Sequence, residues 1–78
     1  MELAYDPRYN VAYLRLHTKK GPVETIHISE ELNIDLAPDG TVYGIELLNA
    51  NEQLCMKEGK IIFVNEARGE RREIPLPQ

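Results

Sequence analysis

The chain has few of the residues that build cross-links and cofactor sites. Among its 78 residues there is one cysteine, Cys55, one phenylalanine and no tryptophan. A single cysteine excludes an internal disulfide framework and fits a reducing compartment. No apolar run approaches the roughly 20 residues of a membrane-spanning helix, and the N-terminus lacks the basic and apolar regions of a signal peptide. We therefore expect a cytoplasmic protein.

Basic residues are missing from the middle of the chain. Residues 21–56 contain seven acidic residues and no lysine or arginine, and the net charge of the whole chain is −4. A nucleic-acid-binding protein needs a basic surface that displaces counterions from phosphates. The acidic centre therefore argues against nucleic acid as a partner.

The remaining composition is ordinary for a small folded protein. Apolar residues make up 42% of the chain and charged residues 28%, which is typical of a globular chain and argues against disorder. A chain of this length has room for one core. We therefore expect residues 1–78 to form a single small β-rich domain.

Residues 32–48 carry the clearest structural pattern. Apolar and polar residues alternate on both sides of a Pro-Asp-Gly turn, which is typical of two strands with one buried face. Comparable stretches predict strands at about 2–5, 11–16, 22–28, 31–36 and 42–48. Because the connections are short, we expect these strands to form an antiparallel five-stranded meander in a mainly β fold, on the border of α+β.

The C-terminal third has a different character. Its pattern predicts a short helix near 50–57, with Leu54 facing inward, and a hairpin formed by 60–64 and 71–76. The first hairpin strand is apolar on both faces, which indicates burial on both sides. We expect the helix and the hairpin to cover the apolar face of the meander, because that face would otherwise be exposed.

The register of the meander predicts which side chains share a face. A slip of one residue would turn a strand's apolar side chains into water. The predicted core rows are Leu3, Leu14, Ile28, Leu32 and Leu47, and then Leu16, Ile26, Ile34 and Ile45. The opposite face aligns Arg15, His27, Asn33 and Glu46, with His17, Thr25, Asp35 and Gly44 in the adjacent row. From that face, the candidate interaction or ligand residues are Arg15, His27, Asn33, Asp35 and Glu46.

Three spaced motifs carry a resemblance to a known family. They are Tyr5-Asp6-Pro7, Ala12-Tyr13-Leu14-Arg15-Leu16, and the run from Asp35-Leu36 through Asp39-Gly40 to Gly44-Ile45-Glu46-Leu47-Leu48. Over about residues 1–51 the chain resembles a small bacterial and archaeal family, domain of unknown function 2283. The resemblance implies a compact β-rich protein with no established activity or assigned catalytic residues. A suspected proximity of some members to toxin-like genes hints at a protein partner.

No catalytic, metal or cofactor site is predicted. His27 could carry a proton near neutral pH, but a single histidine on a solvated strand face reads more simply as a cross-strand pairing residue. Asp35 and Glu46 lie diagonally on neighbouring strands with no evident pocket between them. Neither histidine has a cysteine or carboxylate at a recognised metal-ligand spacing. Cys55 is expected to be a small buried apolar residue.

Three classes of function remain, in descending order. The first is a protein-interaction module, either a homodimer or a partner subunit, that uses the polar face or an exposed strand edge. The second is a small-ligand-binding module in which the polar row makes the contacts and Gly44 leaves a gap beside Asp35. An enzyme ranks last, because no nucleophile, base and orienting group can be placed together.

Overall fold

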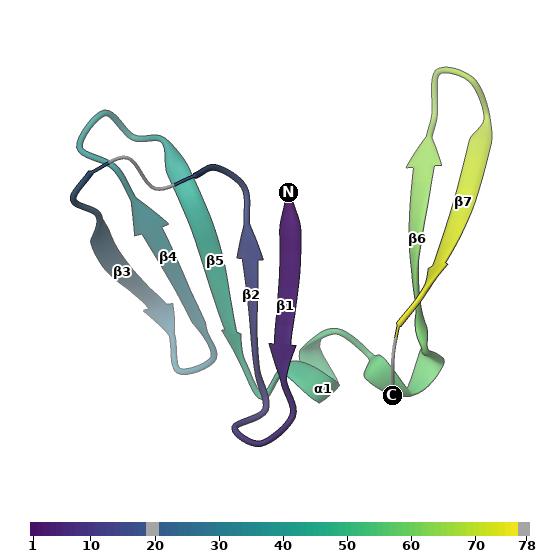
Figure 1. Ribbon diagram of the computed structural model, residues 1–78, viewed down its shortest axis with the longest axis horizontal. Coiled ribbons are helices and arrows are strands. Elements are labelled where there is room, and N and C mark those ends of the chain that lie inside the picture. The colour runs from purple at the N-terminus through teal and green to yellow at the C-terminus, as the bar shows by residue number, and fades with distance from the viewer. Residues whose placement is uncertain (19–20, 77–78) are drawn as a thin grey trace.

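A computed structural model describes residues 1–18 and 21–76 of the chain. Five strands form one antiparallel sheet, a short helix follows, and two further strands form a separate hairpin (Figure 1). The elements are β1 (Glu2–Asp6), β2 (Val11–Arg15), β3 (Glu24–Ser29), β4 (Leu32–Leu36), β5 (Val42–Leu48), α1 (Ala50–Gln53), the 3₁₀ turn η1 (Met56–Glu58), β6 (Lys60–Asn65) and β7 (Glu70–Pro75). The predicted mainly β class, the five-stranded antiparallel sheet, the short helix and the C-terminal hairpin are confirmed.

The strand order differs from the predicted meander. The order is β1-β2-β5-β4-β3, so β5 takes the place beside β2 that the meander gave to β3. Tight turns join β3 to β4 and β4 to β5, which forces those strands to be neighbours. The connection over residues 16–23 is longer than a hairpin turn and leaves β3 free to lie elsewhere. The pairing of β2 with β5 extends past β2, since the amide of Leu16 donates to the carbonyl of Tyr43 at 2.8 Å.

This pairing sets the composition of the apolar face. One row contains Leu3, Leu14, Ile45, Ile34 and Ile26, and the next contains Tyr5, Ala12, Leu47 and Leu32. Both rows differ from the predicted ones because β5 separates β2 from the remaining strands. Ile28, predicted to lie in the core, is 54% exposed. The pairing of β3 with β4 skips this residue at an irregularity between His27 and Ser29.

Helix α1 covers only one end of the apolar face. It contacts β2 and β5, and Ala12 and Ala50 are the only fully buried apolar residues in the described part of the chain. The side chain of Asn10 fixes the start of the helix: it donates to Asn51 Oδ1 at 2.7 Å and accepts from the Asn51 amide at 2.8 Å. Nearby, the side-chain amide of Gln53 donates to the main-chain carbonyl of Glu31 in the β3–β4 turn and to that of Leu48 in β5. The helix is therefore anchored, but most of the apolar face is only half-buried.

The connector after α1 departs from the single predicted helix. Cys55 adopts a left-handed conformation with φ of 50°, which separates α1 from η1. Its thiol is free and its side chain is exposed, so the prediction that Cys55 is buried was wrong. Gly59 also has a positive φ, at 70°, and the chain turns there into β6. Among the described helices, none has the length and apolar character needed to cross a membrane.

Strands β6 and β7, here called the arm, stand beyond β1 (Figure 1). The prediction that this hairpin covers the apolar face of its own sheet was wrong. Ile61, Phe63 and Ile74 are 38%, 57% and 52% exposed. The reason is the connector, because the short helix and the two left-handed residues carry the chain past the β1 edge instead of back over the sheet.

The arm has two different faces. Residues directly opposite each other in a hairpin share a face, so Ile61, Phe63, Arg72 and Ile74 lie on one side. On the other side, Glu73 accepts from Lys60 at 3.1 Å and lies 3.7 Å from Arg71. The expectation that β6 is buried on both sides was therefore wrong, since its apolar residues are exposed on both faces and one face also carries ion pairs.

Candidate functional site

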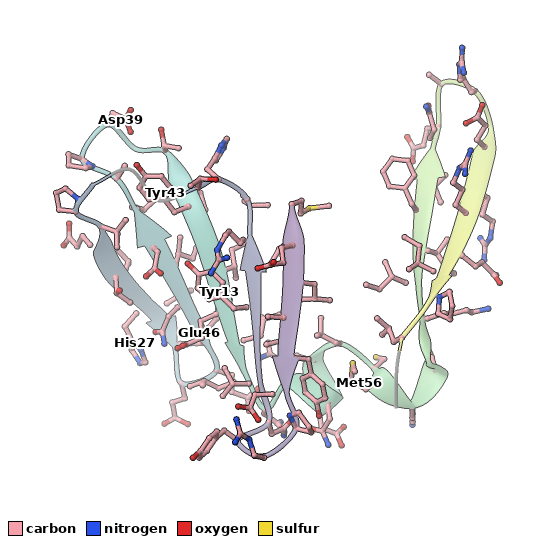
Figure 2. All side chains as sticks on the ribbon, viewed as in Figure 1. Tyr13, His27, Asp39, Tyr43, Glu46 and Met56 are labelled. Atoms are coloured by element: carbon pink, nitrogen blue, oxygen red, sulfur yellow. The ribbon has the colours of Figure 1, made fainter. Side chains whose placement is uncertain are left out.

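A row of hydrogen-bonded side chains crosses the polar face of the sheet. Nδ1 of His27 lies 2.7 Å from Oδ1 of Asn33, and Nδ2 of Asn33 donates to Oε1 of Glu46 at 2.9 Å. With its amide nitrogen committed to Glu46, Asn33 presents its oxygen to the ring, so Nδ1 of His27 is the donor. The alignment of these three residues on β3, β4 and β5 follows the predicted register, and Figure 2 labels its two ends, His27 and Glu46.

Arg15 does not belong to that row, contrary to the prediction. It is opposite Gly44 on β5, and its guanidinium donates to Oε1 of Glu2 at 2.9 Å. Because β2 pairs with β5 and not with β3, the residue opposite Glu46 is Tyr13. The sequence interpretation missed Tyr13 as a member of the polar face.

Tyr13 joins a second polar cluster centred on Asp35. Its hydroxyl donates to one carboxylate oxygen of Asp35 at 2.7 Å, and the hydroxyl of Thr25 donates to the other at 2.7 Å. Gly44 makes this possible, because a Cβ atom at that position would overlap the Tyr13 ring. The predicted gap beside Asp35 is therefore filled by an aromatic ring.

The environment of Tyr13 favours its protonated form. Burial raises the pKa of the hydroxyl to about 12, and the hydrogen bond to Asp35 and the negative charge of that carboxylate act in the same direction. The Arg15 guanidinium lies 5.9 Å from the ring centroid and opposes this effect. Tyr13 is consequently a hydrogen-bond donor at neutral pH and not a general base.

An open hollow lies beside this cluster. It has a volume of about 480 Å³, and its lining includes Tyr13, Arg15, His17, Asp35 and Tyr43. Tyr13 and Tyr43 come from adjacent strands of the sheet (Figure 2). The hollow offers a guanidinium, a carboxylate and hydroxyls, which suit a small polar molecule. Among the described residues that line it, there is no cysteine or serine that could serve as a nucleophile.

A groove on the opposite side of the molecule is apolar. It has a volume of about 620 Å³ and is lined mainly by Leu3, Tyr5, Leu54, Met56 and Leu76. These residues come from β1, the connector and the base of the arm. Met56 marks the connector end of the groove (Figure 2). The inward orientation predicted for Leu54 agrees with its half-buried position here. The groove continues the uncovered apolar face of the sheet.

The described residues offer little for metal or catalytic chemistry. Within residues 1–18 and 21–76, no group of three or more histidine, cysteine, aspartate or glutamate side chains is placed to hold a metal ion. Asp35 and Glu46 occupy separate hydrogen-bonded clusters and do not form a shared acid–base pair. The polar face therefore consists of cross-strand pairs with a shallow hollow at one side.

Two features of this surface had a signal in the sequence. Glycine inside a strand marks a close approach by another group, and Gly44 has that role toward Tyr13. The apolar face of the sheet was visible as an alternating pattern, and residues 60–64 were visible as a strand that is apolar on both faces. Their exposure was not visible, because alternation shows which side chains share a face and does not show what covers them.

The comparisons with known proteins give one result. The family model described as "Protein of unknown function (DUF2283)" matches residues 2–51, whereas no curated protein and no solved structure matches the chain. The matched residues run from β1 to the beginning of α1, so the whole five-stranded sheet lies inside the match and the arm lies outside it. The chain therefore belongs to the DUF2283 family of proteins of unknown function.

Proposed function

We propose that the protein is an interaction module that associates with a second copy of itself through the apolar face of its sheet. The observation that carries this proposal is the exposure of that face. Every large apolar residue in its two rows is only half-buried, and among the described apolar residues only Ala12 and Ala50 are fully buried. Large exposed apolar surfaces of this kind are typical of interaction sites.

The total surface of the chain supports the same proposal. It exposes 6146 Å², whereas a compact monomer of its mass exposes about 4,800 Å². Its radius of gyration is 14.2 Å, compared with about 12 Å for a compact chain of this length. The excess surface is about 1,300 Å² for each copy, more than the roughly 800 Å² that each partner buries in a standard interface.

The polar face is less suited to this role. Its carboxylates, amides and hydroxyls already bond one another, as the pairs of Asp35 with Tyr13 and of Asn33 with Glu46 show. A partner would have to replace these bonds without a net gain in hydrogen bonding. The predicted polar contact face is therefore replaced in this proposal by the apolar face.

Sedimentation equilibrium and native mass spectrometry of the purified chain test the proposal. We expect a species of twice the 8.9 kDa chain mass at micromolar concentration, and a midpoint of thermal unfolding that rises with protein concentration. His27→Ala, on the polar face, is the matched control and should leave the dimer unchanged. A monomer with cooperative, concentration-independent unfolding would contradict the proposal.

Ligand binding at the hollow beside Arg15 is a second candidate function, favoured by the guanidinium and hydroxyls that line it. It predicts amide chemical-shift changes concentrated at Arg15, His17 and Tyr43 when mixtures of polar metabolites are added. Shifts that are absent or spread over the whole sheet would contradict this candidate.

A further inference from the structure

We propose that the arm of each copy lies across the apolar sheet face of the other copy, so that two chains exchange arms reciprocally. This inference rests on the self-association proposed above and adds the identity of the covering element. The occupant of the sheet face is thus a defined segment, β6 and β7 of a second copy.

The arm has an apolar face of the required kind. Ile61, Phe63 and Ile74 lie side by side on it and are all exposed. The reverse face also carries the apolar residues Ile62 and Val64, but there the ion pairs of Glu73 with Lys60 and Arg71 lie between them and suit contact with water. A two-stranded hairpin has little stability on its own, so an arm with one apolar face needs a surface on which to lie.

The chain's own sheet is poorly placed to supply that surface. The arm stands on the side of β1, and the sheet order puts β4 and β3 at the opposite end (Figure 1). At the base of the arm, the Leu76 amide donates to the Gly59 carbonyl at 2.8 Å, which extends the pairing of β6 with β7 and adds no bond to the sheet. Ile34 and Ile26 on those remote strands therefore need cover from another molecule.

The excess surface of each copy is large enough for an exchange of arms. An excess of about 1,300 Å² on each copy corresponds to about 2,600 Å² buried by two copies, which falls within the range of obligate homodimers. Covering a sheet with an arm from the partner makes the same contact twice around a two-fold axis. Such an arrangement closes on itself and leaves no free arm to recruit a third copy.

Charge also favours a contact between arm and sheet. Residues 21–56, which contain β3, β4 and β5, have seven acidic residues and no lysine or arginine. Arg72 projects from the apolar face of the arm and makes no ion pair within residues 1–18 and 21–76. Glu24 lies at the rim of the sheet on edge strand β3, by alternation on the apolar side. An arm laid on a second sheet brings a cation to an acidic rim.

Isotope-filtered nuclear Overhauser spectroscopy on an equal mixture of labelled and unlabelled full-length chains tests the exchange directly. We expect contacts between copies that join the Phe63 ring to methyl groups of Ile34 and Ile45. A dimer whose intermolecular contacts join only sheet to sheet would overturn the exchange and leave self-association standing. A monomer would overturn both proposals.

A pair of substitutions on the two faces of β6 gives a second test. Phe63→Glu should raise the dimer dissociation constant about tenfold or more, because it places a charge in the buried contact. Val64→Glu is the matched control, since Val64 is 49% exposed and lies on the ion-paired face. We expect it to leave the dissociation constant nearly unchanged. Equal effects of the two substitutions would overturn the proposed orientation of the arm.

Discussion

The sheet and the arm are both amphipathic β-structures, but their polar side chains are bonded in different ways. The sheet joins five strands and links its polar side chains across them, from His27 to Glu46 and from Thr25 to Tyr13. The arm has two strands and holds its outer face together with surface ion pairs. Each leaves one apolar face uncovered. The comparison shows that the strands are paired in both regions, while the burial that normally stabilises such pairing is partial in the sheet and still smaller in the arm.

The largest effect on stability and assembly is expected from a charge placed in the centre of the sheet's apolar face. Ile45 lies between Leu14 and Ile34 in the row that crosses all five strands. Ile45→Asp should abolish dimerisation and lower the free energy of unfolding by about 3 kcal/mol or more, because a buried unpaired carboxylate replaces a packed side chain. Urea denaturation and sedimentation velocity measure the two effects.

The arm offers the matching control. Ile62 is 39% exposed and lies on the face that carries the ion pairs. Ile62→Asp should leave both the assembly and the unfolding midpoint close to those of the parent chain. If it disrupted the protein as severely as Ile45→Asp, the proposed division between a covered and a solvated face of the arm would fail.

A smaller effect, confined to the sheet, is expected from Gly44→Ala. The added methyl group overlaps the Tyr13 ring, so the ring must move and its hydrogen bond to Asp35 breaks. We expect a loss of about 1 to 3 kcal/mol in the free energy of unfolding. Gly21→Ala is the control, because no atom of the described residues lies within 4 Å of a Cβ atom placed there. Similar losses for both variants would show that Tyr13 packing is not the cause.

The smallest effect is expected from alkaline pH, which should lower the stability of the sheet through Tyr13 and leave the arm unaffected. The ordinary pKa of 10.0 rises to about 12 for Tyr13 in the folded chain, so the folded state holds this proton more tightly. Its stabilising contribution is complete below pH 10 and is lost as the pH rises through about 12. Chemical denaturation at a series of pH values should show this decline, and Tyr13→Phe should flatten it. An unchanged slope in that variant would assign the decline to other groups.

The sequence predicted the strands and their faces because alternation is a local property. His27, Asn33 and Glu46 align as predicted because tight turns join their three strands in succession. The strand order could not be predicted in the same way, since the connection at residues 16–23 permits β2 to lie beside either β3 or β5. Because β2 lies beside β5, Tyr13 and not Arg15 is the β2 residue in the row of His27, Asn33 and Glu46.

The position of the arm could not be predicted from local sequence patterns, for a different reason. The apolar residues from Ile61 to Val64 predicted a buried strand, and burial within the same chain was the simplest expectation. The direction of the connector depends on left-handed conformations at Cys55 and Gly59, and a cysteine has no strong preference for that conformation. The sequence therefore predicted a surface that needs cover without predicting where the cover comes from.

The hydrogen bonds between Asn10 and Asn51 show how far the sheet depends on the chain that follows it. They join residues 41 positions apart and close the first helical turn onto the sheet at the point where the family match ends. The chain beyond this point contributes no strand to the sheet, although Gln53 still bonds to the main chain of Glu31 and Leu48. All pairings of the five-stranded sheet are thus made by residues that precede the arm, and a different C-terminal segment would leave those pairings in place.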